Sequence, residues 1–561
     1  MTTSLFMQPA LVLIAGGLLL PLMRGALRSA WLLVIPLIAL TLVSTVPDGA
    51  ALTASYLGQQ LVLVKGDNLS RLFAIVFSIM AFAGALFALN QQRTSELSAA
   101  FVYAGSAIGA CFAGDLVSLF VFWEAMAIAS TIVVWSSGPD ARGAGLRYAA
   151  MHFLGGAILM AGIAGEFAAT GSLEFGRMDA STAPRCLILA GFLINAAAMP
   201  LSAWLPDAYP KASWSGMVFL SAFTTKTAVY VLIRGFPGAE ILIWIGLAMV
   251  FYGIVFAILE NDMRRILAYS IVNQVGFMVV GVGIGTEMAL NGASAHAFTH
   301  IIYKALLLMS AGSVLYMTGI RKCTDLGGLF RTMPLTTACG IVGALSISSF
   351  PLTSGFVSKS MVLEGAAQAH MQVVWLLLEA ASAGVFLHAG IKFPWFVFFQ
   401  RDSGLRPSDP PWNMRAAMIL CSALCVGIGV MPQLLYALLP FKVDYAPYTA
   451  SHVVSQLQLL LFSGLAFFLL LGLLARTMTI TLDVDWLWRR LGRNVLSWLD
   501  AGAGRRWESA TRKLSAASHA ALTRLHRHHA PTGVFGRSWP TGTMAFWMTV
   551  MLGAYLILAY V

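Results

Sequence analysis

NGASAHAFTHIIYKALLLMSAG, residues 291–312, is an apolar stretch that carries three basic side chains, His296, His300 and Lys304. Their spacing of four residues places all three along one face of a predicted helix. An ionisable side chain inside a membrane span costs about 3 kcal/mol or more, so such groups usually face the protein interior or a water-filled path. The row therefore predicts a membrane helix that takes part in a proton relay.

The composition of the whole chain is that of a polytopic membrane protein. Of its 561 residues, 58% are hydrophobic and 11% are charged, far outside the usage of soluble domains. The six cysteines form no CxxC pair, so we expect neither a metal site nor a disulfide framework. Motifs for nucleotides or iron–sulfur clusters are missing, so we expect no cofactor, and the energy must come from an ion gradient or a partner.

Apolar stretches long enough to span a membrane, which needs about 20 residues, recur along the entire sequence. We therefore expect an all-α polytopic membrane protein with about 14–16 transmembrane helices. A further stretch, 47–66, alternates apolar and polar residues and predicts an external hairpin. The predicted spans are 9–23, 30–46, 69–89, 97–113, 115–135, 144–169, 185–206, 213–235, 238–259, 265–286, 291–318, 334–353, 373–399, 414–433, 453–475 and 543–561.

Basic residues predict the orientation of these spans. Most loop arginines and lysines fall on one side, which the positive-inside rule makes cytoplasmic. The same count places both termini outside and residues 476–542 inside. This segment alternates arginines with tryptophans and leucines, which predicts a basic amphipathic helix on the inner leaflet of a bacterial inner membrane. Its charge indicates contact with the lipid bilayer and not with nucleic acid.

Two helices near the middle carry similar breaks. MPLSAWLPDAYP (199–210) and FPLTSGFVSK (350–359) both combine Pro-Leu-Ser/Thr with small residues, and the span count gives their helices opposite directions. Discontinuous helices at corresponding places of two inverted halves indicate an ion path; ordinary proline kinks are the alternative. The predicted organisation is N-terminal helices 1–95, a first repeat 96–236, a second repeat 237–400, additional helices 401–475, the amphipathic segment 476–542 and a final helix 543–561.

Ionisable residues also lie inside other predicted spans. Glu124 lies in the middle of one span, and Lys226 is its basic counterpart in the same half. A change in their separation can make a buried lysine take up or release a proton. Lys359 follows the second break and is either intramembrane or interfacial.

A second group of ionisable residues has a less defined role. His388 and Lys392 lie one turn apart on the same predicted helix as Glu379. These residues could extend a relay toward a water face. Alternatively, the Lys392 side chain simply reaches the cytoplasmic end of its helix. Glu166 and His152 are interpreted as lining or interfacial residues, with no role assigned.

Together the motifs resemble a known family. NDMRRILAYSIVNQVGF (261–277), HAFTHIIYKALLLMSAGSV (296–314), DLGGLF (325–330) and both break motifs resemble the antiporter-like subunits of respiratory complex I, membrane-bound hydrogenases and multisubunit Mrp-type cation/proton antiporters. The likeness covers roughly residues 70–475 and is greatest to the D-type subunit of the Mrp antiporters. The resemblance implies that Glu124 is the family's glutamate in the fifth helix and that Lys226 is its lysine in the eighth. It also implies that a relay joins the two halves and that one lysine is a channel residue. The relay residues are His296, His300 and Lys304, and the channel residue is Lys359.

One position departs from the family pattern. Five residues before the Pro-Leu of the first break, where the family usually carries a lysine, this chain has Asn195, which cannot titrate. Either Glu124 works with Lys226, or the first half is not a full proton channel. If Glu124 and Lys226 act alone, Glu124→Gln abolishes transport and Asn195→Ala leaves most of it. Ser202, Lys211 and Trp214 also depart from the residues that relatives favour.

Three functions agree with the sequence. The first is a proton-translocating membrane subunit of a multisubunit sodium/proton antiporter that works with other membrane subunits. The second is a proton-pumping membrane subunit of a complex-I-like NADH:quinone oxidoreductase or hydrogenase, with no redox site of its own. The third is a membrane coupling or scaffold subunit, for example for inorganic-carbon uptake, with an incomplete ion path; Asn195 favours this third function.

Overall fold

The computed structural model describes residues 8–56, 58–472, 504–530 and 540–560, with single positions between 483 and 498 and residue 533. Thirteen of the described helices are long and apolar enough to cross a membrane, and three shorter apolar helices accompany them. Each coincides with one predicted span, so the all-α polytopic class is confirmed, with 13 candidate spans among the described residues. The chain forms two compact units, 1–483 and 484–561.

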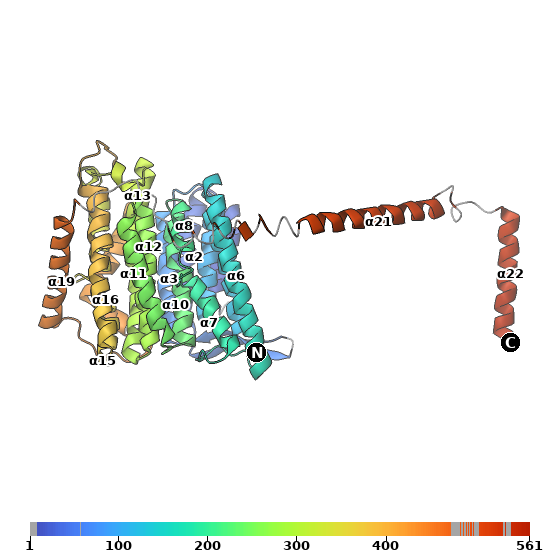
Figure 1. The fold of residues 1–561 in the computed structure, drawn as a ribbon, viewed down its shortest axis with the longest axis horizontal. Helices are drawn as coiled ribbons and strands as arrows, with labels where there is room; N and C mark the ends of the chain where they lie inside the picture. The colour runs from blue at the N-terminus through green and yellow to red at the C-terminus, as the bar shows by residue number, and fades with distance from the viewer. Residues whose placement is uncertain are drawn as a thin grey trace. The chain divides into compact units, whose positions relative to one another are not determined.

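The first unit is a bundle of consecutive helices with one hairpin (Figure 1). Up to the first break its elements are α1 (Pro9–Leu19), α2 (Gly25–Thr45), β1 (Gly49–Tyr56), β2 (Gln59–Gly66), α3 (Asn68–Phe87), α4 (Thr94–Phe112), α5 (Leu116–Trp135), α6 (Pro139–Thr170) and α7 (Ala183–Asn195). Between the breaks follow α8 (Trp204–Ala208), α9 (Gly216–Ala222), α10 (Thr224–Gly235), α11 (Ile241–Leu259), α12 (Met263–Ile284), α13 (Glu287–Thr318) and α14 (Pro334–Ile347).

After the second break the first unit continues with further α-helices and two π-helical segments. They are α15 (Ser354–Gln368), α16 (Gln372–Val385), the π-helical segments Phe386–Lys392 and Trp395–Phe399, α17 (Trp412–Val430), α18 (Gln433–Tyr436) and α19 (Ala450–Leu469). Short 3₁₀ turns lie at Leu20–Leu22, Tyr209–Lys211, Cys323–Asp325 and Leu329–Arg331.

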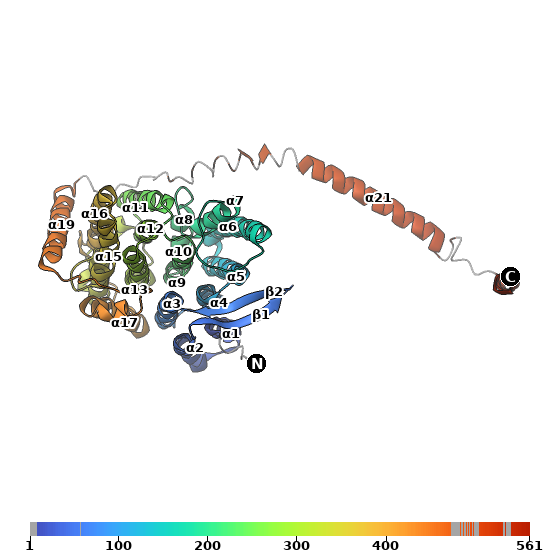
Figure 2. The same ribbon diagram turned by 90° about the horizontal axis from the view of Figure 1, so that it is seen from below.

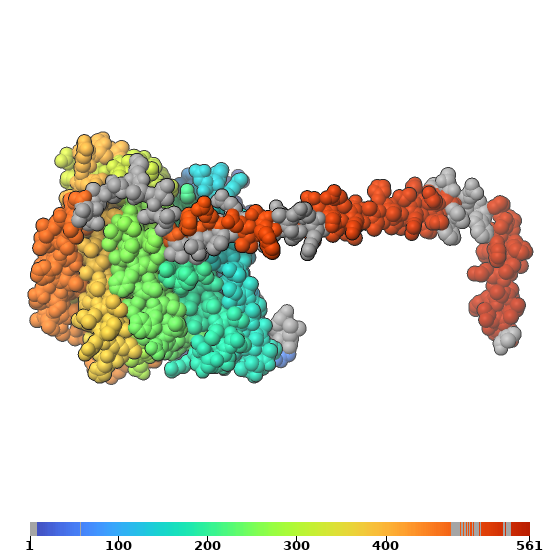
Figure 3. Space-filling view, viewed as in Figure 1, coloured from blue at the N-terminus to red at the C-terminus, as the bar shows by residue number. Residues whose placement is uncertain are grey.

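The interior of this bundle is formed by α10, α12 and α13 (Figure 2). The most apolar windows of 216–235 and 263–284 are entirely buried, although both contain polar side chains. On the outside, α19, α16 and α11 lie side by side (Figure 3) and expose apolar side chains such as Trp244, Val255 and Leu461. Apolar residues outside and polar residues inside are the pattern that a bilayer requires.

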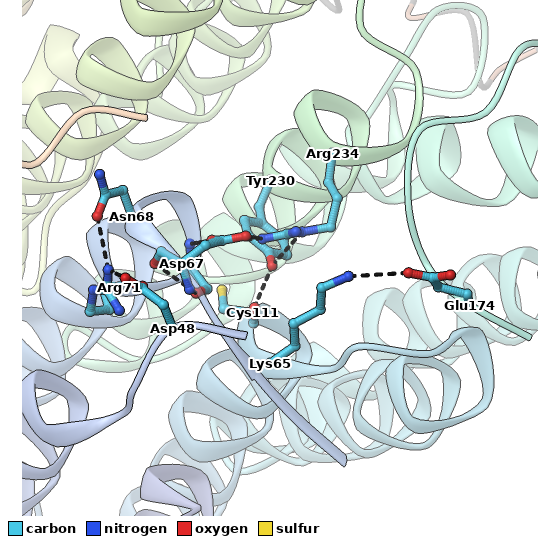
Figure 4. A network of polar contacts seen from close by, with 10 residues as sticks. Asp48, Lys65, Asp67, Asn68, Arg71, Cys111, Glu174, Tyr230 and Arg234 are labelled. Atoms are coloured by element: carbon cyan, nitrogen blue, oxygen red, sulfur yellow. Dashed lines mark hydrogen bonds and ion pairs between the residues drawn. The ribbon is translucent and has the colours of Figure 1, made fainter. Parts of the chain in front are cut away.

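The predicted hairpin at 47–66 is present as the antiparallel pair β1–β2. At its base, Asp67 caps α3 by accepting a hydrogen bond from the Ser70 amide (2.8 Å) and pairs with Arg234 of α10 (2.7 Å; Figure 4). Burial is the largest single effect and raises the pKa of Asp67, but the charge of Arg234 and the hydrogen bonds from Ser70 and Arg234 together outweigh it, so this pKa lies below its usual value. Further ion pairs join Arg71 to Asp48 and Lys65 to Glu174.

The order of the helices defines two loop faces. Loops 88–93, 136–138, 260–262, 319–333 and 400–411 share one face, which we call the basic loop face, and the hairpin lies on the opposite face. By this order α7 starts at the opposite face, whereas α14 starts at the basic loop face. This arrangement is compatible with the predicted inverted repeats.

Both predicted helix breaks are present and have the same local geometry. Each of α7 and α14 ends in a Schellman motif, with Ala197 (φ 58°) and Ser349 (φ 57°) in the left-handed region. The next amide bonds the carbonyl five residues earlier at 3.0 Å in both cases. Prolines follow immediately, because a proline cannot continue the helix.

Three predicted spans differ from the structure in detail. The helices predicted at 185–206 and 334–353 stop at Asn195 and Ile347, because the left-handed residues and prolines end them earlier than hydropathy indicates. The span predicted at 213–235 is divided at Phe223 into α9 and α10. The sequence predicts no span over 354–368, which forms α15; its serines, lysine and glutamate lower its hydropathy, and other helices bury it.

The second unit contains α21 (Arg505–His529) and α22 (Thr541–Tyr560). A helix is therefore present in the predicted amphipathic segment, and α22 matches the predicted final span. Most of 476–504 lies outside the described residues. The position of α21 on the inner leaflet stays a prediction.

Candidate ion path

The predicted basic row lies on α13 and is wholly buried. The rings of His296 and His300 are 6.0 Å apart, and each lies close to the ring of Tyr303. Among the described residues, neither nitrogen of either histidine has a hydrogen-bond partner. Buried polar atoms are normally satisfied by protein or ordered water, so the ring nitrogens of both imidazoles are open to a hydrogen-bond partner.

Polar side chains of α12 lie against the row. Lys304 Nζ donates to Ser270 Oγ (2.8 Å), and the Tyr303 hydroxyl donates to Gln274 Oε1 (3.2 Å). Sequence reasoning missed both partners. Their signal was present, because Ser270 and Gln274 are four residues apart in an apolar span and therefore share one helix face.

Lys226 lies just after the interruption between α9 and α10, and the cause of that interruption is Tyr103 of α4. The Thr224 amide donates to the Tyr103 hydroxyl (2.8 Å), which lies 3.4 Å from the Leu220 carbonyl that this amide would bond in a regular helix. A side chain inserted into the hydrogen-bond ladder bends a helix. The Ser221 carbonyl, freed by the bend, accepts a hydrogen bond from Lys226 Nζ (2.7 Å).

Glu124 and Lys226 do not form an ion pair in the described part of the chain. The Glu124 carboxylate lies against α6, where a methyl group at Gly156 would be 1.8 Å from Oε1. Lys226 instead lies within electrostatic range of His300 and Lys304. Lys226 therefore acts on the basic row of α13, whereas the Glu124 carboxylate lies against α6.

Asn195 is hydrogen-bonded to His152 of α6. The His152 Nδ1 and Asn195 Oδ1 atoms are 2.7 Å apart, and the imidazole packs against the rings of Tyr148 (4.2 Å) and Trp204 (4.6 Å). His152 is 1% exposed and Glu166 is 8% exposed, so both side chains are buried. Glu166 pairs with the half-buried Arg185 (3.0 Å).

Lys359 lies at the other end of the basic row. Its Nζ is 5.1 Å from the centroid of Phe277, whose ring also lies 6.3 Å from His296. Lys359 is 1% exposed, and its Nζ has no hydrogen-bond partner among the described residues. The Lys359 side chain is therefore enclosed by the bundle, and its depth in the membrane stays a prediction.

A cavity of about 490 Å³ reaches Lys359. Residues 444–449, which follow α17, help to line it, so it lies toward the face opposite to the basic loop face. Glu379 lines the same cavity and acts electrostatically on Lys359. Water can therefore approach Lys359 from that side. The remaining ionisable lining residues are Glu364, Asp444, Tyr445 and His452.

His388 and Lys392 lie in the first π-helical segment. Lys392 Nζ donates to the carbonyls of Ala257 (2.9 Å), Ile258 (2.5 Å) and Glu260 (2.6 Å), which are at the end of α11. A lysine in this position caps the helix. Lys392 Nζ thus lies beside loop 260–262 of the basic loop face, with the side chain only 3% exposed. The choice between the two alternatives for Lys392 stays a prediction. His388 Nδ1 donates to the Gly384 carbonyl (2.8 Å).

Comparison with known proteins adds independent information. Residues 113–384 match the transmembrane family described as NADH:quinone oxidoreductase/Mrp antiporter. The N-type subunit of the NADH-quinone oxidoreductase of Desulforudis audaxviator is 32% identical over 49% of this chain and 59% of its own length. The D-type subunit of a Na⁺/H⁺ antiporter from Alkalihalophilus pseudofirmus is 30% identical over 53% of this chain and 66% of its own length. The chain thus spans less than two thirds of these curated relatives.

A solved structure shares the fold. In the structure of the Mrp complex from Dietzia sp. DQ12-45-1b, one chain superimposes with a TM-score of 0.68 and 22% identity, over 80% of the present chain and 99% of that chain. At this level of identity the likeness concerns the fold alone.

Proposed function

We propose that this chain, which belongs to the antiporter-like membrane subunits of the NADH:quinone oxidoreductase/Mrp antiporter family, translocates protons in a multisubunit antiporter that exchanges them for sodium ions. The observation that carries the proposal is the row of buried cations and imidazoles on α13 and the helices around it. Such groups are expensive in a membrane interior and are retained where they move ions.

The proposed path has three contiguous parts. The charge of Lys226 acts on His300 and Lys304. The rings of His296 and His300 are neighbours on α13. Phe277 then contacts both His296 and Lys359. The cavity with Glu379 gives Lys359 access to water at the face opposite to the basic loop face. Protons would therefore pass along α13 and exchange with water through the second half.

Other membrane subunits are proposed as partners, since the solved relative is part of a complex and both curated relatives are named as subunits. We place the complete assembly in the bacterial inner membrane. The basic loop face is proposed to be cytoplasmic, by the positive-inside rule.

The first prediction concerns the transported ions. In everted vesicles that contain the complete complex, sodium added to vesicles with an imposed pH gradient should dissipate the gradient, and the change is read with a pH-sensitive dye. Lys359→Met should remove this response, because Lys359 joins the row to the cavity. Lys442→Met, a substitution in the loop after α17, should retain it. A complex that shows no sodium-dependent proton movement would contradict the proposal.

The likeness to an oxidoreductase subunit favours a second candidate function. In that case the same path would be driven by electron transfer in partner subunits. Quinone reduction would then acidify the vesicles, and sodium would have no effect. Measuring both responses in one vesicle preparation separates the two drivers.

A further prediction tests the place of Glu124. Gly156→Ala puts a methyl group where the Glu124 carboxylate lies, so the carboxylate must move away from α6. We expect sodium-driven proton movement to fall about tenfold, since misplacing a proton-transfer group removes much of its contribution. Stability should change little, because the end of a flexible side chain can move.

The matched control is Gly427→Ala in α17, where a methyl group would meet no atom within 4 Å. Both substitutions replace a helical glycine with alanine, which favours the helix by about 1 kcal/mol. Equal transport by the two variants would show that the position of the Glu124 carboxylate is irrelevant.

A further inference from the structure

We propose that His152 carries the proton through the first half of the chain, and that Asn195 prepares it for this role. The inference rests on the proposed proton translocation. Asn195 itself cannot titrate, but in this proposal it acts on the neighbouring imidazole of His152, which can.

The hydrogen bond between these two residues selects one tautomer of the imidazole. The Asn195 Oδ1 atom can only accept, so His152 Nδ1 carries the hydrogen and donates it across 2.7 Å. In the neutral ring Nε2 is then the unprotonated atom. His152 Nε2 is buried and has no partner among the described residues, so its lone pair is available to a proton.

A proton donor lies one helical turn away. The Glu124 carboxylate lies against Gly156, which is four residues after His152 on the same face of α6. Positions 152 and 156 are about 5.4 Å apart along the helix axis, and in the proposed transfer a water molecule would connect the carboxylate to Nε2. Protonated Glu124 can give its proton to Nε2, which leaves a carboxylate and an imidazolium, and the carboxylate is then reprotonated from water.

Hydroxyl groups continue from His152 toward Lys226. The ring of Tyr148 packs on His152 and lies 6.3 Å from the ring of Tyr209. The Tyr148 hydroxyl donates to Ser130 Oγ (2.9 Å), and the buried Tyr209 hydroxyl has no hydrogen-bond partner among the described residues. The Tyr103 hydroxyl is hydrogen-bonded to the Thr224 hydroxyl. Each hydroxyl can accept one proton while it donates another. In the proposed step the imidazolium returns to its neutral tautomer when the Nε2 proton is relayed along these hydroxyls to the neutral amine of Lys226, two residues after Thr224, and this amine becomes an ammonium.

Charged neighbours of His152 are few. Among the described residues, Glu124 of α5 lies against Gly156, one turn further along α6. The phenol of Tyr148 packs on His152 itself, and that of Tyr209 packs on Tyr148. The acidic residue of α8, Asp207, pairs with Arg147, and the basic residue of α7, Arg185, pairs with Glu166. A new charge at position 195 should therefore dominate the protonation of His152.

The test uses the complete complex in everted vesicles and records the pH profile of sodium-driven proton movement. His152→Gln keeps a donor for Asn195 but cannot titrate, and we expect the rate to fall at least about tenfold. Asn195→Asp places a carboxylate beside Nδ1, which should move the profile toward higher pH by about one unit. In the double variant, His152→Gln with Asn195→Asp, this displacement should be absent.

The controls separate the possible failures. His370→Asn changes a histidine in the turn after α15 and should leave the rate unchanged. Thermal unfolding of each purified complex identifies a variant that fails to assemble. Transport by the complex that His152→Gln does not slow would overturn this inference alone. A pH displacement by Asn195→Asp that persists without His152 would also overturn it, whereas an inactive unmodified complex would contradict the proposed function.

Discussion

Replacing Lys304 with methionine should reduce sodium-driven proton movement at least about 100-fold, the scale on which one proton-transfer group contributes to a rate. Lys304 is wholly buried on α13, and its hydrogen bond goes to Ser270 Oγ (2.8 Å). Methionine has a similar length and no charge. The substitution removes only the lysine of the pair, and the Ser270 hydroxyl can rotate to donate to a backbone carbonyl of its own helix, so the complex should still assemble.

The measurement is the dye response of everted vesicles at matched amounts of complex, together with thermal unfolding of the purified complex. Lys322→Met, in a loop of the basic loop face, is the matched control and should retain full transport. If Lys304→Met transports at the normal rate, the row on α13 is a structural feature and not a path.

The second large effect is expected at Lys392 and concerns stability. Lys392→Met removes the donor for three carbonyls at the end of α11. An unsatisfied buried carbonyl costs about 1–3 kcal/mol, so the free energy of unfolding should fall by roughly 3 kcal/mol or more. Transport by the complex that does assemble should be almost normal, because the proposed path does not include this lysine.

Thermal unfolding measures the loss of stability of the Lys392→Met variant. The rate of sodium-driven proton movement per assembled complex measures its transport. Lys392→Arg retains several donors and should recover part of the stability. The opposite outcome, loss of transport with unchanged unfolding, would assign Lys392 to the ion path and reject its role as a helix cap.

The sequence predicted those features that depend on length, hydropathy and proline. Spans, the hairpin and both breaks follow from rules of this kind, because a bilayer fixes helix length and a proline ends a helix. The division at Phe223 could not be predicted, since its cause is a hydroxyl from α4, a helix far earlier in the chain. The helix at 354–368 was missed because protein and not lipid surrounds it.

The candidate site was predicted as a set of residues but not as a set of contacts. Charged groups in apolar stretches identify Glu124, Lys226, Lys359 and the row on α13 from composition alone. Their partners are ordinary serines, tyrosines and backbone carbonyls, which are too common in a sequence to stand out. The role of His152 was likewise not predictable from the sequence, because only the structure shows its hydrogen bond to Asn195.

The bend at Phe223 means that the position of Lys226 and the shape of its helix are mechanically linked. Tyr103 holds the bend open, and Lys226 Nζ occupies the carbonyl of Ser221 that the bend exposes. If the lysine swings toward α13, that carbonyl loses its donor, at a cost of about 1–3 kcal/mol in a dry interior. Straightening the helix would restore a backbone donor to it. The hydrogen bond of Lys226 thus stabilises the bent form of its helix. A movement of Lys226 away from Ser221 would favour the straight form.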